Sequence, residues 1–162
     1  MNWMKKVAVA LVCLLPLGLQ AAKVDTLQVK SPSMNKSIEV VVVSPDVAAT
    51  KACPVIYLLH GYGGNACTWV GIKPDLPKIA DEKGIFFVCP DGKNTWYWDS
   101  PLNADVRYET FISNELVKYV DSHYKTVADR KGRAITGLSM GGHGAMWNGL
   151  RHSDVFSAAG ST

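Results

Sequence analysis

Residues 133–150 read RAITGLSMGGHGAMWNGL, and this stretch decides the fold that the sequence predicts. It begins with a short apolar strand at residues 134–136, passes through a glycine-dependent turn and continues into a helix. Residues 137–141 have the form Gly-x-Ser-x-Gly, in which a serine stands on a sharp turn between strand and helix with its hydroxyl exposed. Such a turn brings strand and helix so close together that larger side chains at Gly137 and Gly141 would collide.

The same five residues also fit an ordinary joint between a strand and a helix, because Gly-x-Ser-x-Gly is a loose pattern in a chain with 14 glycines. The strand predicted before Ser139 and the helix predicted after it favour a nucleophile elbow, which needs both. The helix N-terminus also directs free amides and the positive end of its dipole toward the place where an oxyanion would form. The pattern therefore makes Ser139 the candidate nucleophile.

A second glycine-rich segment, His60-Gly61-Tyr62-Gly63-Gly64, follows the continuous apolar run at residues 54–59. Such a run is typical of a parallel strand that is buried on both faces. In a doubly wound sheet the loop after this strand leaves the same edge as Ser139, and that edge is where such folds bind ligands. We therefore assign an oxyanion hole to the backbone N–H groups of Tyr62 and Met140. The loop lacks the lysine and hydroxyl pair of a nucleotide-binding loop.

The rest of the chain predicts strands that alternate with helices, which indicates an α/β fold. Its sheet is expected to be mostly parallel, with helices on both faces and no linker or internal repeat that would mark a second domain. The expected elements are strands at 27–34 and 37–44 joined as a hairpin, a helix at 76–83, a strand at 85–89, an amphipathic helix at about 107–124, and a further strand within 155–161.

The N-terminal residues 1–22 are expected to be a signal peptide rather than part of the domain. Two lysines precede an apolar run at 7–19 that is too short to cross a bilayer comfortably, and a small-residue cleavage point follows, after Ala21 or Ala22. The globular domain is then expected to span residues 23–162. We expect the protein to be exported to the periplasm or the medium, with no stable membrane anchor after cleavage.

Charge and cysteine content exclude several partner classes. The first 22 residues contain two of the 17 basic side chains and none of the 14 acidic ones, so the remaining chain is nearly neutral and predicts no nucleic-acid partner. No spacing of His, Cys, Asp and Glu resembles a metal site, and no cofactor is expected. Of the cysteines Cys53, Cys67 and Cys89, only the last two are placed to pair, and free buried thiols are favoured over that pair.

Four motifs, in this order and at these spacings, resemble the "Putative esterase" family of α/β-hydrolases: YLLHGYGG, CPDG followed by the WYWDSP loop, RYETFISNEL, and GLSMGGHGAMWNGLRH. That family includes S-formylglutathione hydrolases, feruloyl and acetyl-xylan esterases, tributyrin-type esterases and mycolyltransferases. The resemblance covers residues 27–162. It implies a secreted serine carboxylesterase that forms an acyl-enzyme on Ser139, with Tyr62 and Met140 as the oxyanion hole and a small-molecule or polysaccharide-linked ester as substrate.

The resemblance departs from the family pattern near the C-terminus. Family members carry a catalytic triad in the order Ser, then Asp or Glu, then His. After Ser139 the sequence offers His143, His152 and Asp154, which lie too close to the nucleophile or at the far end of its helix, so we expect the triad acid and histidine to be absent from this chain. We count about six of the usual eight strands and expect a C-terminally truncated α/β-hydrolase that is inactive or weakly active. Two alternatives stay open, a non-catalytic remnant that binds esters or carbohydrates and an acyltransferase of the same fold.

An aromatic cluster, Trp96-Tyr97-Trp98, lies in the loop at residues 93–103. We expect these three residues to bind substrate, because flat rings at the ligand edge of a sheet suit phenolic or fatty groups. The alternative is that they wedge the loop against the core. The remaining candidates are expected to be structural: His60 shapes the oxyanion loop, Asp91 and Asp99 lie in turns, Arg107 and Glu109 serve the junction of loop and helix, and His123 is a packed or surface residue.

Overall fold

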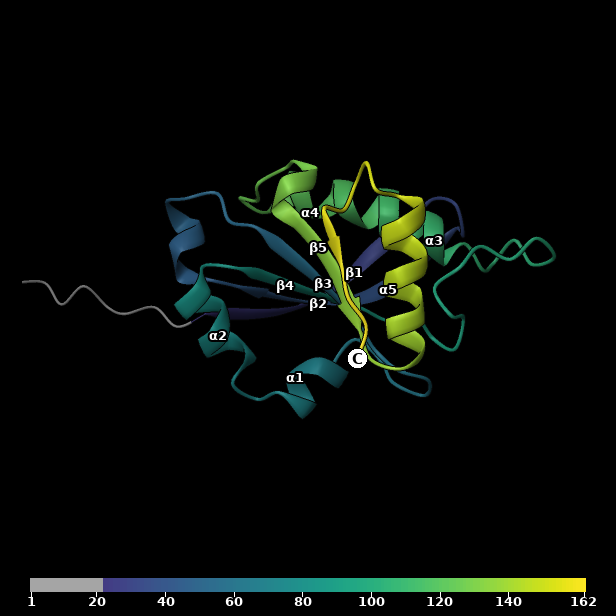
Figure 1. The fold of residues 1–162 in the computed structure, drawn as a ribbon, viewed down its shortest axis with the longest axis horizontal. Helices are drawn as coiled ribbons and strands as arrows, with labels where there is room; N and C mark the ends of the chain where they lie inside the picture. Colours follow the sequence, from purple (N-terminus) through teal and green to yellow (C-terminus); the bar gives the residue numbers. More distant parts are fainter. Residues whose placement is uncertain (1–21) are drawn as a thin grey trace, which may run out of the picture.

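A computed structural model describes residues 22–162 of the protein (Figure 1). The predicted signal peptide, residues 1–22, lies outside the described residues except for Ala22. No helix in the described part of the chain is long and apolar enough to cross a membrane. The described residues form one mixed sheet in the order β1-β2-β4-β3-β5-β6. Its strands are β1 (Lys23–Ser31), β2 (Lys36–Ser44), β3 (Val55–Leu59), β4 (Phe86–Pro90), β5 (Arg133–Gly137) and β6 (Ala158–Ala159).

Strand directions follow the sequence prediction. β1 and β2 form an antiparallel hairpin, and β2 also pairs antiparallel with β4. The pairs β3–β4, β3–β5 and β5–β6 are parallel. The predicted hairpin and the mostly parallel sheet behind it are therefore confirmed, and the sheet of the described residues has the six strands that the sequence indicated.

The second hairpin strand explains how an antiparallel element can lie inside the sheet. Four consecutive valines, 40–43, are fully buried. Because successive side chains of a strand point to opposite faces, Val40 and Val42 join one apolar cluster while Val41 and Val43 join another. The turn before β2 places Asn35 at a φ of 49°, a conformation that asparagine tolerates better than most residues. The turn therefore fixes the register of the hairpin locally, and β2 buries side chains on both of its faces.

Helices cover both faces of the sheet, as Figure 1 shows. Leu76 and Ala80 pack in the smaller cluster with Val41 and Val43, whereas Met140 and Ala145 pack in the larger one with Val40 and Val42. The short helix at residues 68–72 was not predicted from the sequence. The helical elements are η1 (Asp46–Ala49), α1 (Thr68–Ile72), α2 (Leu76–Lys83), α3 (Tyr108–Thr110), η2 (Phe111–Leu116), α4 (Val117–His123), η3 (Arg130–Gly132) and α5 (Met140–Arg151).

The amphipathic helix predicted at about 107–124 is present but is not a uniform α-helix. Its central segment η2 has π-helical backbone, in which the hydrogen bonds span five residues and the turn is wider. Phe111 and Leu116 are five residues apart and are both fully buried. The helix begins where Asp99 accepts hydrogen bonds from the backbone N and the Oγ1 of Thr110, at 3.0 and 2.5 Å. Asp99 was predicted to lie in a turn, and in the structure its carboxylate holds the first turn of this helix.

All three cysteines of the described residues are free thiols. Cys53 and Cys89 are buried, as the sequence predicted, but Cys67 is exposed. The prediction of a buried thiol was therefore wrong for Cys67, because residue 67 lies in the loop that leaves the sheet just before α1. Burial raises the pKa of both Cys53 and Cys89, so these thiols stay protonated at neutral pH.

Candidate active site

Ser139 stands between the end of β5 and the start of α5 in strained backbone geometry. Its φ is 54° and its ψ is −117°, a combination that side-chain-bearing residues rarely adopt and that is found where the surrounding structure enforces it. The residue is exposed. Its backbone N donates to the carbonyl oxygen of Thr162 at 2.9 Å, and its carbonyl oxygen accepts from His143 N at 3.0 Å. The strand, sharp turn and helix expected of a nucleophile elbow are all present.

Two glycines make this turn possible. A Cβ atom added at Gly137 would overlap the backbone of Gly141, and one added at Gly141 would overlap the carbonyl group of Leu59 at the end of β3. Any residue larger than glycine would therefore push α5 away from the sheet. The steric reason that the sequence suggested for both glycines is confirmed.

The loop after β3 lies directly beside the serine. An added Cβ atom at Gly61 would be 3.6 Å from the Cβ of Ser139. Within the described residues, the backbone N–H groups of Tyr62 and Met140 donate to no other protein group, so both are available to an oxyanion. Their assignment to the oxyanion hole stays a prediction. The Tyr62 side chain is 67% exposed, which agrees with a role for its backbone rather than its ring.

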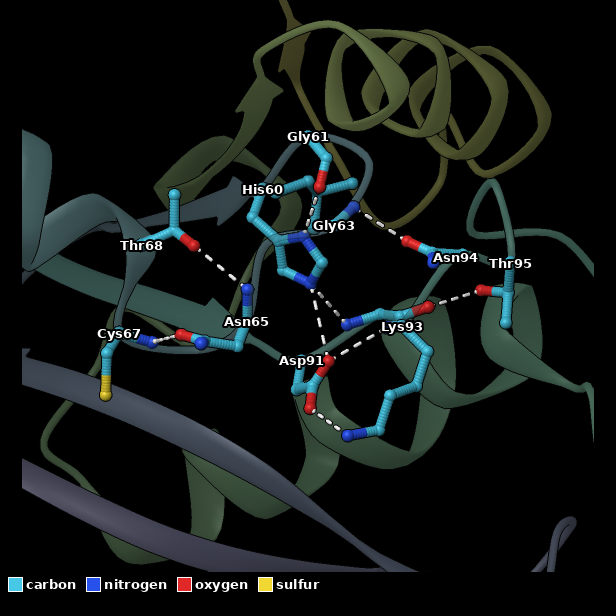
Figure 2. Close-up of polar contacts among 12 residues, drawn as sticks. His60, Gly61, Gly63, Asn65, Cys67, Thr68, Asp91, Lys93, Asn94 and Thr95 are labelled. Atoms are coloured by element: carbon cyan, nitrogen blue, oxygen red, sulfur yellow. Dashed lines mark hydrogen bonds and ion pairs between the residues drawn. The ribbon is translucent and has the colours of Figure 1, made fainter.

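His60 holds the oxyanion loop in place from inside the protein (Figure 2). The ring is buried; its Nδ1 donates to the carbonyl oxygen of Gly61 at 2.7 Å, and its Nε2 accepts from Gly92 N at 2.9 Å. With one nitrogen donating and the other accepting, the imidazole is neutral and fixed in one tautomer. The 3.4 Å approach of Nε2 to Asp91 is therefore no ion pair. His60 is structural, as the sequence analysis expected.

Asp91 organises the neighbouring turn. Its Oδ1 accepts from Lys93 N at 2.9 Å and its Oδ2 from the Lys93 ammonium at 2.5 Å. Burial raises the pKa of Asp91, but the contacts of its carboxylate with His60 and with Lys93 together outweigh burial and hold the pKa below its ordinary value. On the other side of the loop, Gly63 N donates to Asn94 Oδ1 at 2.7 Å, as the dashed lines in Figure 2 show. These bonds join the loop after β3 to the loop after β4.

The structure corrects the prediction that Tyr97 binds substrate, because its side chain has no exposed surface. Its hydroxyl donates to the carbonyl oxygen of His60 at 3.1 Å. Its ring fills the space that a Cβ atom would need at Gly92 and at Gly144. Asn148 Nδ2 donates to its carbonyl oxygen at 3.0 Å. Tyr97 is thus the wedge that fixes the aromatic loop to α5, which was the alternative for this cluster.

Trp96 and Trp98 flank that wedge and are exposed, at 44% and 45%. Together with His143 they line a hollow of about 320 Å³. The rings of Trp96 and His143 meet edge to face with centroids 5.3 Å apart. Trp147 extends the aromatic surface. Its ring is stacked nearly parallel to that of His143, and the two ring centroids are 6.1 Å apart. The two tryptophans thus remain candidates for substrate binding.

The contribution of α5 to this hollow was not predicted from the sequence. His143 and Trp147 follow Ser139 at intervals of four residues, and that spacing places residues on the same face of a helix. A second hollow of about 390 Å³ continues along this face, lined by His143, Met146, Trp147, Leu150 and Arg151. Helical spacing counted from the nucleophile was therefore the signal that could have found these residues.

The histidines after Ser139 are engaged elsewhere. His143 Nδ1 donates to the carbonyl oxygen of Trp96 at 3.2 Å. His152 Nε2 lies 2.8 Å from Glu109 Oε1, and Asp154 is exposed. Within residues 22–162 no histidine forms a hydrogen bond with the Ser139 hydroxyl. In the same range, no group of three or more His, Cys, Asp and Glu side chains is placed to hold a metal ion.

Glu109 joins two helices instead of serving only the loop-helix junction. Its carboxylate accepts from Trp147 Nε1 at 2.6 Å and from Arg151 Nε at 2.8 Å, besides the contact with His152. Burial raises the pKa of Glu109, but the hydrogen bonds from Arg151, Trp147 and His152 outweigh burial and lower it. Arg107 is the residue at which the helix begins, as predicted. His123 is exposed on α4 and stacks on Tyr119 at 4.0 Å, in agreement with the sequence analysis.

Comparison with known proteins identifies the fold and the family. An acetyl esterase of Caldicellulosiruptor saccharolyticus is 32% identical over 102 residues, which are 62% of this chain and 37% of that protein. The solved structure of a ferulic acid esterase is 32% identical, with a TM-score of 0.73 over 85% of this chain and 58% of that one. An S-formylglutathione hydrolase from Agrobacterium tumefaciens is 25% identical, with a TM-score of 0.76 over 85% and 57% of the two chains.

These structures have the α/β-hydrolase fold, so the predicted fold class is confirmed. The chain spans little more than half the length of the two solved structures and about a third of the acetyl esterase. A family model described as "Putative esterase" matches residues 31–162, and the chain therefore belongs to this esterase family.

Proposed function

We propose that the protein hydrolyses carboxylic esters through an acyl-enzyme formed on Ser139. The observation that carries this proposal is the backbone of Ser139, strained at a φ of 54° and exposed at the edge of the sheet beside the glycine-rich loop. Strain of this kind is held where function needs it. Membership of the esterase family and the similarity to an acetyl esterase and a ferulic acid esterase support the reaction class.

In the proposed mechanism the Ser139 hydroxyl loses its proton to a general base and attacks the ester carbonyl carbon. The N–H groups of Tyr62 and Met140 stabilise the negative charge that develops on the carbonyl oxygen. Met140 is the first residue of α5, so the helix dipole adds to this stabilisation. The alcohol leaves, and water then hydrolyses the acyl-enzyme.

The general base is the one participant that residues 22–162 do not place beside the nucleophile. Serine without such a base is a weak nucleophile, and serine proteases that lack one triad member retain about 10³ to 10⁴-fold catalysis over water. We therefore expect the chain by itself to hydrolyse activated esters slowly. A histidine supplied from outside these residues would raise the rate without moving the oxyanion hole.

We propose an aromatic or acyl group as the part of the substrate that lies on Trp96 and Trp98. Both rings are exposed, and they line a hollow together with His143, which lies one helical turn after the nucleophile. Aromatic surfaces bind planar phenolic groups by stacking and by burial of apolar area. A ferulic acid esterase among the similar structures supports this choice of substrate. Export of the enzyme, proposed from residues 1–22, would bring it into contact with polysaccharide-linked esters.

A serine-directed probe tests the proposal. The protein would be treated with a fluorophosphonate and its mass measured, and hydrolysis of p-nitrophenyl acetate and methyl ferulate would be followed. We expect one adduct on Ser139, and loss of both adduct and hydrolysis in Ser139→Ala. Ser122→Ala, which removes an exposed hydroxyl on α4, is the matched control and should change neither. Ester binding that survives in Ser139→Ala with no turnover in either protein would instead support a binding protein.

A further inference from the structure

Ala22, the first described residue, is docked on the body of the protein. Its backbone N donates to Asp81 Oδ2 at 2.8 Å, across 59 residues of sequence. Its methyl group packs against the smaller apolar cluster, next to α2. In Figure 1 the purple start of the described chain lies beside α2, in agreement with this contact. The chain is therefore held at residue 22, before β1 begins.

Among residues 22–162, the carboxylate that holds Ala22 has no cationic side chain as a partner. Asp81 Oδ1 accepts from the backbone N of Asp46 at 2.8 Å, and within the described residues no lysine, arginine or histidine forms an ion pair with Asp81. Lys23, the nearest basic residue in sequence to Ala22, pairs with Asp25 at 3.0 Å. Within the described residues, the Asp81 carboxylate is therefore hydrogen-bonded by the backbone N–H groups of Ala22 and Asp46 and by no basic side chain.

Two features of the surroundings add negative potential around the Asp81 carboxylate. Asp81 lies in the second half of α2 (Leu76–Lys83), where the helix dipole disfavours a carboxylate. The Asp46 carboxylate is also close, and its pKa is raised by burial and by the charge of Asp81. A positive charge at the position of the Ala22 nitrogen would offset both effects.

We propose that a signal peptidase cleaves the chain between Ala21 and Ala22, and that the new α-ammonium of Ala22 forms an ion pair with Asp81. Water is the co-reactant. The C–N bond between the two residues breaks, the oxygen of the water becomes part of the Ala21 carboxylate, and its two protons go to the Ala22 nitrogen. The contact at 2.8 Å is thus converted from an amide hydrogen bond into a charge-assisted one with three donors. The sequence pattern alone allowed cleavage after Ala21 or after Ala22.

The two cleavage positions differ in their physical consequences. Cleavage after Ala22 would remove the nitrogen that Asp81 binds and leave Lys23 as the first residue. Cleavage after Ala21 keeps that nitrogen and adds a charge, because an α-amino group has an ordinary pKa of about 7.7 to 8.0 and is protonated at neutral pH. Of the two products, the one that begins at Ala22 is therefore the one that keeps the contact with Asp81. This inference does not depend on the esterase activity.

The first test reads the N-terminus of the exported protein. The full chain would be expressed in a secreting bacterial host, and the N-terminal peptide of the exported protein would be identified by mass spectrometry. We expect the mature sequence to begin Ala22-Lys23-Val24. A mature chain that begins at Lys23, or one that keeps residues before Ala22, would overturn the proposal.

The second test separates the ion pair from a purely structural role of Asp81. Asp81→Asn would be introduced into the form that begins at Ala22 and into a form with one glycine added before Ala22, which moves the ammonium away but keeps the amide contact. We expect the substitution to lower the melting temperature about 2 to 4 °C more in the first form than in the second. Any cost at the Asp46 amide occurs in both forms and cancels.

Asp75→Asn is the matched control. Asp75 lies at the start of the same helix, and its carboxylate pairs with the Lys73 ammonium at 2.8 Å rather than with the N-terminal residue. Its effect on the melting temperature should be the same in both forms. Equal effects of Asp81→Asn in the two forms would show that the Ala22 ammonium adds nothing and would overturn the ion pair.

Discussion

At the scale of single residues, the site depends on side chains that hold backbone rather than touch substrate. His60, buried and neutral, hydrogen-bonds the loops after β3 and β4 with its two ring nitrogens. Tyr97 holds the aromatic loop against α5 from below. The positions of Trp96 and of the Tyr62 amide follow from these two buried side chains.

Tyr97→Ala should destabilise the protein by about 3 to 5 kcal/mol, the usual cost of removing a buried aromatic side chain. Tyr97→Phe keeps the ring and loses only the hydrogen bond to the His60 carbonyl oxygen, so we expect a loss of about 1 kcal/mol. Urea denaturation would measure both values. Trp96→Ala, at an exposed position, should change the free energy of unfolding far less, and a cost for it equal to that of Tyr97→Ala would contradict the assignment of Tyr97 as the wedge.

Gly141→Ala should displace α5 from the end of β3, because the added methyl group would overlap the carbonyl group of Leu59. We expect a large loss of stability and of any reactivity at Ser139, measured by thermal unfolding and by labelling with a fluorophosphonate. Gly71→Ala in α1 is the matched control, since a Cβ atom there meets no neighbouring atom. Normal unfolding of the Gly141 variant would show that the elbow does not need this close approach.

At the scale of elements, two helices on one face of the sheet act as a unit. Glu109 of α3 accepts hydrogen bonds from Trp147 and Arg151 of α5 and contacts His152 just after it. Because α5 also carries Ser139 at its N-terminus, this contact fixes the far end of the helix that presents the nucleophile. The π-helical segment that follows α3 buries Phe111 and Leu116 in the same apolar cluster.

Glu109→Gln should destabilise the protein in a pH-dependent way. The pKa of Glu109 is lowered in the folded state, so its stabilising contribution is present above the ordinary pKa of glutamate, about 4.3, and is lost as the pH falls through the lowered value. Urea denaturation should therefore separate the variant from the wild type at pH 7 and bring the two curves together in acid. Glu82→Gln, at an exposed position on α2, should change little at either pH. A difference for Glu109→Gln that persists in acid would mean that packing, not charge, holds the helices.

At the scale of the whole molecule, the sheet separates two apolar clusters and distributes the thiols between the inside and the surface. Cys53 lies in the larger cluster and Cys89 in the smaller one, whereas Cys67 faces solvent. The order of strands also brings the loops after β3, β4 and β5 to one edge. The same arrangement therefore decides both which groups surround Ser139 and which thiols a reagent can reach.

Thiol titration tests this arrangement. In the folded protein that begins at Ala22, a disulfide reagent such as dithionitrobenzoate should modify only Cys67 quickly, and denaturant should expose two further thiols. Burial raises the pKa of Cys89 and Cys53, which removes their reactive thiolate form. Rapid modification of Cys89 in the native state would contradict the packing of α2 on the sheet.

The sequence by itself determined the strands, the parallel sheet behind an antiparallel hairpin, and the sharp turn at Ser139. These features depend on residues that are neighbours in the sequence. Apolar periodicity defines each element, and the glycines at 137 and 141 allow the helix to lie close to the strands. Only the tertiary structure decided which rings of the aromatic loop are exposed, namely Trp96 and Trp98, and that Tyr97 is buried between them. It alone also placed His143 in the hollow that the two tryptophans line. Residues of similar chemistry in one loop differ there because contacts with α5, far along the chain, select which ring is buried.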